Sequence, residues 1–151
     1  MNIRLLVIDK DAETNSEILR RYFRMCSENT ATVEPYKTQS SGLDALKNPK
    51  HDMLEVALIG IVGNSFSLYN KVPKWADFSP AEIFRIAREH NPDSILFAYS
   101  TIFSEAEALS WGADGYMDKG EYLRFDNDLF YLDQKIMDLA KERNLTQPRS
   151  D

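Results

Sequence analysis

The chain has 151 residues, of which 43% are hydrophobic, 28% charged and 11% aromatic, and its formal net charge is −6. This length suits one domain with a substantial core, and the apolar content excludes a disordered chain. The excess of acidic over basic residues argues against nucleic acid as a partner. No apolar run reaches the ~18 residues that span a bilayer. The chain has a single cysteine, which excludes an internal disulfide.

The chain begins with a strand and a helix. Residues 3–9 (IRLLVID) are nearly all apolar, which is typical of a strand covered on both faces. Asp11 is suited to cap the helix that follows. Apolar residues recur in that helix at helical spacing: Ile18, Leu19, Tyr22, Phe23 and Cys26. Cys26 is therefore expected to be a core thiol.

The next segment holds two further strands around a short helix. Residues 31–37 (ATVEPYK) predict a weaker strand, and Pro35 indicates that it lies at a sheet edge. A short helix is expected at about residues 40–47, before an Asn-Pro pair. Residues 55–62 (EVALIGIV) form the second strongly apolar strand pattern.

Two helix-capping patterns occur in the second half of the chain. Ser79 precedes a proline and has a glutamate three residues later, which predicts a helix start. After a buried strand at residues 94–99 (SILFAY), Ser104 and Glu107 form a second capping box. A brief strand at residues 115–118 precedes a long helix. The inner stripe of that helix consists of Leu129, Leu132, Ile136, Leu139 and Ala140.

Five strands thus alternate strictly with five helices. This pattern favours an α/β fold with a doubly wound, five-stranded parallel sheet in a three-layer α/β/α sandwich. We expect one domain over residues 1–144 and a loose tail over residues 145–151. The working crevice of such folds lies at the carboxyl ends of the strands. Those ends fall at residues 9–11, 60–64, 98–101 and 118–120.

Three segments at these ends resemble the receiver domain of bacterial response regulators (CheY-like, with a flavodoxin-like fold). They are VIDKDAE (residues 7–13), EVALIG (residues 55–60) and GADGYMDKG (residues 112–120). The last segment is the most specific, because it matches several residue types of the family's GADGYLxKP segment. The resemblance implies a signalling module of two-component type, in which an aspartate accepts a phosphoryl group with the help of Mg²⁺.

This chain departs from the family at the residues that carry that chemistry. Gly60 stands where the family has the phosphorylated aspartate, and no Asp or Glu lies between Val56 and Lys74 that a shifted register would recover. Asp9 matches the first acid of the metal pair, but Lys10 replaces the second. An ammonium group would repel Mg²⁺ there, so we expect neither metal nor another cofactor.

The remaining family positions are matched in part. Lys119 matches the active-site lysine, and Tyr116 matches the switch aromatic, although an ordinary edge-strand aromatic is an equally good interpretation. The hydroxyl position of the fourth strand falls on Ala98 or Tyr99, or on Ser100 if the strand runs longer.

Two further features have alternative interpretations. Asp9 either forms a fixed ion pair with Lys119 or Lys10, in place of metal and phosphate, or these are solvated charges. Residues 63–78 form a long, aromatic connection. Its side chains either fill the vacated crevice or leave Phe66, Tyr69 and Trp75 as anchors for a partner.

The leading hypothesis is a degenerate receiver, not an enzyme, that acts by phosphorylation-independent contact with a protein such as a histidine kinase. The face formed by the fourth helix, the fifth strand and the fifth helix serves homodimerisation or partner docking in the family, which is what the resemblance implies here, and the alternative is an ordinary solvated helix surface. The alternatives are a conventional Mg²⁺-dependent phosphate acceptor and a small-ligand sensor that uses the crevice. With no signal peptide, the expected compartment is the cytoplasm, without membrane contact.

Overall fold

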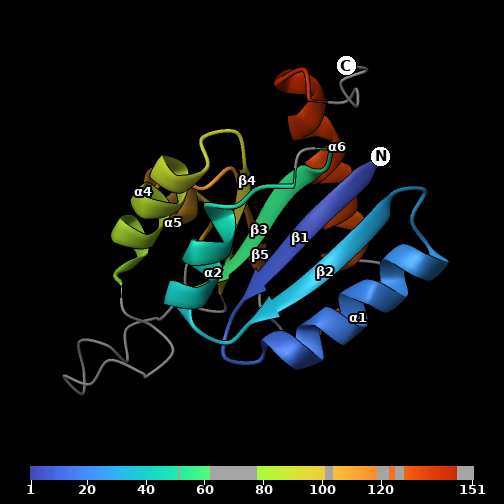
Figure 1. Ribbon diagram of the computed structural model, residues 1–151, viewed down its shortest axis with the longest axis horizontal. Coiled ribbons are helices and arrows are strands. Elements are labelled where there is room, and N and C mark those ends of the chain that lie inside the picture. The colour runs from blue at the N-terminus through green and yellow to red at the C-terminus, as the bar shows by residue number, and fades with distance from the viewer. Residues whose placement is uncertain (51, 62–77, 101–103, 119–122, 125–127, 146–151) are drawn as a thin grey trace.

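The computed structural model describes residues 1–50, 52–61, 78–100, 104–118, 123–124 and 128–145 (Figure 1). Five parallel strands form one sheet in the order β2-β1-β3-β4-β5. In chain order they are β1 (Asn2–Ile8), β2 (Thr30–Tyr36), β3 (Leu54–Gly60), β4 (Ile95–Ser100) and β5 (Gly115–Asp118). The strand order reverses at β1, which has β2 on one side and β3 on the other, so the predicted doubly wound topology is confirmed.

Helices cover both faces of this sheet (Figure 1). One face carries α1 (Ala12–Met25) and α6 (Phe130–Glu142), and the other carries α2 (Gln39–Leu46), α4 (Pro80–His90) and α5 (Glu105–Ser110). The three-layer sandwich predicted from the alternating pattern is therefore present. β2 lies at one edge of the sheet, and Pro35 falls within it, as predicted.

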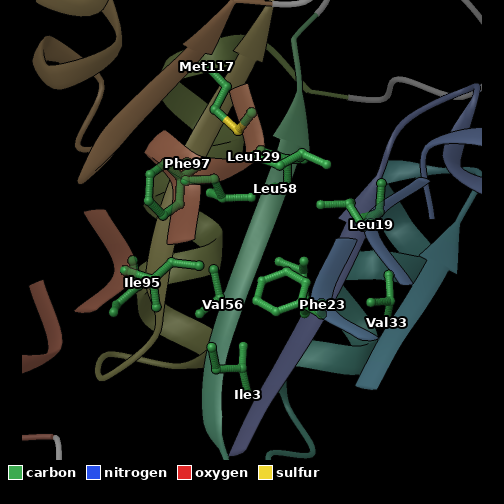
Figure 2. Close-up of a cluster of buried hydrophobic side chains, with 14 of the residues drawn as sticks. Ile3, Leu19, Phe23, Val33, Val56, Leu58, Ile95, Phe97, Met117 and Leu129 are labelled. Carbon is green, nitrogen blue, oxygen red and sulfur yellow. The ribbon is translucent and has the colours of Figure 1, made fainter. Parts of the chain in front are cut away.

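The two faces of the sheet make two separate cores, because successive side chains of a strand point to opposite sides. Leu5 and Val7 of β1 belong to the core beneath α1 and α6, whereas Leu6 and Ile8 belong to the core beneath α2, α4 and α5. Figure 2 shows the first core, in which Leu19 and Phe23 of α1 approach the sheet from one side. The central strands are buried on both faces, which explains their continuous apolar runs.

Two of the three predicted helix caps are confirmed. The Ser79 side chain accepts a hydrogen bond from the backbone N–H of Glu82, and Ser104 and Glu107 form a reciprocal capping box. The prediction for Asp11 is wrong in part. Asp11 occupies the N-cap position of α1, but its side chain makes no capping hydrogen bond. Its backbone has φ −102° and ψ 30°, outside the extended conformation in which a capping side chain ordinarily accepts from the first turn.

Cys26 corrects another prediction, because its side chain is exposed rather than buried in the core. The inner face of α1 includes Leu19, Tyr22 and Phe23, so helical spacing would bring Cys26 to the same side. The helix ends at Met25, however, and the backbone of Cys26 turns away with φ −123°. Periodicity therefore places a side chain correctly only while the helix continues.

A buried ion-pair network holds the opposite end of the sheet, away from the carboxyl ends of the strands. Arg4 of β1 donates to Glu34 Oε2 at 2.7 Å and to Glu55 Oε1 at 2.6 Å. Its guanidinium also donates to the carbonyl oxygens of Ala45 and Asn48 at the end of α2. Arg4 lowers the pKa of Glu34, whereas burial raises the pKa of Glu55. This network ties three strands and one helix together.

Candidate functional site

The carboxyl ends of three central strands meet at one place, where the family resemblance puts its site. Ile8 pairs with Ile59, so Asp9 comes directly after β1 beside the last residue of β3. That residue, Gly60, pairs in turn with Tyr99 of β4. Asp9, Gly60 and Tyr99 thus come together from three neighbouring strands.

Asp9 is wholly buried, with 0% of its surface exposed. Its Oδ2 atom accepts a hydrogen bond from Asn15 Nδ2 of α1 at 3.3 Å. The backbone of Asp9 is held as well, because its N–H donates to Tyr36 O and its carbonyl accepts from the N–H of Ala12. The acid is therefore built into the junction of β1, β2 and α1.

Asp9 also takes up the space beside Gly60. A Cβ atom built on Gly60 would lie 2.5 Å from Asp9 Oδ1, 3.0 Å from Asp9 Cγ and 3.1 Å from Ile8 O. Distances under 3.0 Å are not tolerated by ordinary packing, so a side chain here would require Asp9 to move. The Asp9 carboxylate thus lies in the space that a side chain at residue 60 would take.

The register of β4 decides which residue stands beside Gly60 at the fourth strand. Tyr99 pairs with Gly60 and packs in the core beneath α1 and α6, on the side to which Asn15 also contributes. Ala98 packs in the opposite core, beneath α2, α4 and α5. The side chain of Ser100 lies outside the described residues. Tyr99 is therefore the β4 residue in register with the Asp9–Gly60 pair.

Tyr99 is buried, with 1% of its surface exposed, and its environment is acidic. Burial raises the pKa of the Tyr99 hydroxyl, and the carboxylates of Asp9, Asp128 and Asp11 raise it further. The neutral phenol is therefore strongly favoured. Asp9 and Tyr99 are thus both buried near the carboxyl ends of β1 and β4.

The other residues singled out from the sequence fall into two groups. Lys10 is exposed, so it does not share the buried environment of Asp9. Tyr116 is half-buried and packs against the core beneath α2, α4 and α5. Burial raises its pKa, and so do the nearby carboxylates of Asp118 and Glu107. The second group, consisting of Lys119, Phe66, Tyr69 and Trp75, lies outside the described residues.

The side chains at this site do not fit the Mg²⁺ of the receiver family. Among the residues that the structure describes, no group of three or more His, Cys, Asp or Glu side chains could hold a metal ion. Gly60 offers no side-chain oxygen, the exposed Lys10 is cationic, and Asp9 is already engaged by Asn15. A hard divalent cation needs several oxygen ligands, which this set does not supply.

Asp114 forms a second polar cluster that sequence reasoning missed. Its carboxylate makes ion pairs with Arg88 of α4, at 2.9 Å, and with Arg143 at the end of α6. It also accepts a hydrogen bond from the backbone N–H of Leu96 at 2.8 Å. Asp114 therefore ties both helical layers to β4 at the end of the sheet opposite the crevice. An aspartate just before a strand does not reveal such partners, because they come from distant parts of the chain.

Comparisons with solved structures place this fold among known proteins. A response regulator receiver domain protein (CheY-like) from Methanospirillum hungatei JF-1 matches with a TM-score of 0.64 at 19% identity, over 94% of this chain and 99% of that one. The fold is that of a receiver domain. A receiver domain protein from Clostridium thermocellum gives a TM-score of 0.61 at 15% identity, over 96% of this chain and 99% of that one.

A third structure with the receiver fold is a response regulator from Burkholderia pseudomallei, solved with a phosphorylated aspartic acid, a calcium ion and citrate. It matches with a TM-score of 0.55 at 17% identity, over 97% of this chain and 75% of that one. No protein-family model and no curated protein matched the sequence. Within the described part of this receiver fold, no helix is long and apolar enough to cross a membrane.

Proposed function

We propose that this chain is a signalling module of two-component type that has lost aspartyl phosphorylation and acts by contact with another protein. It has no catalytic role of its own in this proposal. The observation that carries it is the Asp9–Gly60 contact, because Asp9 Oδ1 stands 2.5 Å from where a Cβ of residue 60 would be. A phosphoryl acceptor at this position would need both a carboxylate and room for the phosphoryl group.

Three further observations support the proposal. Gly60 cannot act as a nucleophile, Lys10 is exposed in the position of the second metal-binding acid, and the buried Tyr99 pairs with Gly60. Asp9 and Tyr99 are both buried near the ends of β1 and β4, so neither residue offers an exposed polar group to the ligand of the small-ligand alternative. The receiver fold supplies the framework for signalling, while the conventional switch chemistry is replaced.

The fixed ion pair of Asp9 with Lys119 belongs to this proposal. Asp9 is buried at the end of β1, and Lys119 follows Asp118, the last residue of β5. The alternative pair with Lys10 is disfavoured, since Lys10 is exposed while Asp9 is not. A histidine kinase or another signalling protein in the cytoplasm is the expected kind of partner.

Treatment with acetyl phosphate and Mg²⁺, followed by intact-mass measurement, tests the loss of phosphorylation. We expect no added phosphoryl group under conditions in which a conventional receiver domain, run in parallel, becomes labelled. An acid-stable, base-labile phosphoryl adduct on an aspartate would overturn the proposal and restore the conventional alternative. A small molecule that copurifies and binds stoichiometrically would instead favour the ligand sensor.

A further inference from the structure

Strand β2 lies at an edge of the sheet. In the described part of the chain, it pairs with β1 on one side and with no strand on the other. Unpaired backbone groups along such an edge can pair with a strand of another chain. The N–H of Thr30 and the carbonyl of Tyr36 form hydrogen bonds with residues that flank β1, so the even-numbered residues of β2 face the sheet. The outward residues of this edge are therefore Ala31, Val33 and Pro35.

Arg20 of α1 covers one of the outward groups. Helix α1 runs alongside β2 (Figure 1), so a long side chain of this helix can reach the edge of the strand. Arg20 Nη2 donates to Val33 O at 2.8 Å, and Arg20 Nη1 donates to Glu17 Oε1 at 2.7 Å. Because a guanidinium presents its donors in a rigid fork, the bond to Glu17 helps to orient the donor that holds Val33 O. An N–H of an added strand would have to approach the same oxygen, beside which this cation lies.

Pro35 removes a donor from the same edge. Proline has no backbone N–H, so at an outward position it costs β2 no hydrogen bond to β1. The carbonyl of the neighbouring Tyr36 still bonds on the β1 side, so pairing with β1 continues past the proline. A strand added outside β2 would find no N–H at residue 35. Two of the three outward residues, Val33 and Pro35, are thus poorly suited to a second ladder.

A second copy of this chain would need these same two residues. In a symmetric antiparallel pair that overlaps the whole of β2, Val33 faces Val33 of the other copy, and Ala31 faces Pro35. The first pairing needs the oxygen that Arg20 holds, and the second needs the N–H that proline lacks. We propose that Arg20 and Pro35 together close the β2 edge to strand addition by a second copy of this chain. This closure concerns self-association and is independent of the function proposed above.

The closure can be removed by substitutions outside the core. The Arg20 side chain is 39% exposed, and the Glu17 side chain with which it pairs is 70% exposed. Methionine at residue 20 keeps an unbranched, flexible stem and removes every hydrogen-bond donor. Valine at residue 35 restores the missing N–H and is favoured in strands. The double variant, Arg20→Met with Pro35→Val, should therefore keep the fold and open the edge.

Sedimentation velocity over a range of protein concentrations compares the wild type with the double variant. We expect the double variant to dimerise about tenfold more tightly than the wild type, or tighter still. Amide hydrogen exchange locates the interface, and we expect the amides of Ala31 and Val33 to gain protection in the dimer. Arg21→Met with Pro35→Val is the matched control, since Arg21 is the exposed neighbour of Arg20 in α1 and carries the same charge. This control should associate no more tightly than Pro35→Val alone.

Several results would overturn the closure of this edge. These are a double variant that associates no more than the wild type, equal association of the matched control, or a double-variant dimer whose protected amides lie outside β2. Protection of Ala31 and Val33 in the wild type, through a dimer or on addition of a synthetic Thr/Val strand peptide, would show that the edge is open. Arg20→Met alone leaves the sequence of β2 unchanged, so it keeps the test decisive if Pro35→Val unfolds the protein. It should also associate more tightly than Arg21→Met.

Discussion

The carboxylate of Asp9 lies so close to the backbone of Gly60 that a Cβ atom on residue 60 would stand 2.5 Å from Asp9 Oδ1. Asp9 is fully buried and is held by Asn15, so it has little freedom to move aside. The packing of Asp9 therefore depends on the glycine at residue 60, and residue 60 has no room for a side chain while Asp9 is in place. β3 ends in a residue without a side chain, and the acid at the end of β1 occupies the space that results.

A side chain at residue 60 should therefore destabilise the protein. We expect Gly60→Ala to lower the free energy of unfolding by about 1–3 kcal/mol, as overpacking of a buried site ordinarily does. Urea denaturation measures this loss. In a double-mutant cycle, Asp9→Ala should reduce the cost of Gly60→Ala, because it removes the atoms that the new Cβ would meet. Additive effects would contradict the proposed contact.

Loss of the Asp9 carboxylate should affect stability independently of Mg²⁺. Asp9→Ala leaves the buried Nδ2 of Asn15 without its carboxylate acceptor, which should cost about 1–2 kcal/mol. We expect the same loss in the presence of Mg²⁺ and of a chelator. Asp11→Ala is the matched control, since Asp11 is exposed and makes no capping bond, and it should change stability by less than about 0.5 kcal/mol. A loss seen only with Mg²⁺ would speak for a metal site.

Stability should fall at alkaline pH through Tyr22. Burial, together with Asp133, raises the pKa of Tyr22 from 10.0 to about 12, and the hydroxyl donates to Asp133 Oδ2 at 3.2 Å. The folded state keeps its proton where the unfolded chain loses it. This contribution is therefore complete below pH 10.0 and is lost as the pH rises toward about 12.

Urea midpoints measured at intervals above neutral pH check the prediction for Tyr22. Tyr22→Phe should lower stability at neutral pH by about 1 kcal/mol and make the alkaline decline shallower. The decline should not vanish, because burial also raises the pKa of Tyr36, Tyr99, Tyr116 and Tyr131. An unchanged alkaline slope in Tyr22→Phe would show that Tyr22 does not carry this effect.

The Asp114 cluster should contribute more to stability than an ordinary surface ion pair. Asp114→Ala removes the partner of both Arg88 and Arg143 and the acceptor of the Leu96 N–H. We expect a loss of about 2–3 kcal/mol in the free energy of unfolding, since charged hydrogen bonds to a largely buried carboxylate are broken. Arg85→Gln is the control, because the exposed pair with Glu89 should be worth less than about 0.5 kcal/mol. Equal losses in the two variants would show that the cluster has no special role.

Much of the fold was predictable from local patterns. The apolar run at residues 3–9 and the capping pattern of Ser104 and Glu107 act over a few residues, so each is legible from sequence order alone. The alternation of strands and helices then restricts the topology, because right-handed crossovers allow few arrangements. Local rules failed where a helix ended, as at Cys26, whose expected burial required α1 to continue by one more residue.

The candidate site also has features that the sequence establishes and features that required the folded structure. The order of residues is enough to establish that residue 60 is glycine, that residue 10 is lysine and that no acid lies nearby to replace the missing acceptor. Packing of the strands was needed to establish that Tyr99, rather than Ala98, shares the core beneath α1 and α6, and that Asp9 takes the space beside Gly60. The reason is the two-residue period of a strand, in which a shift of one residue in register moves a side chain to the other face of the sheet.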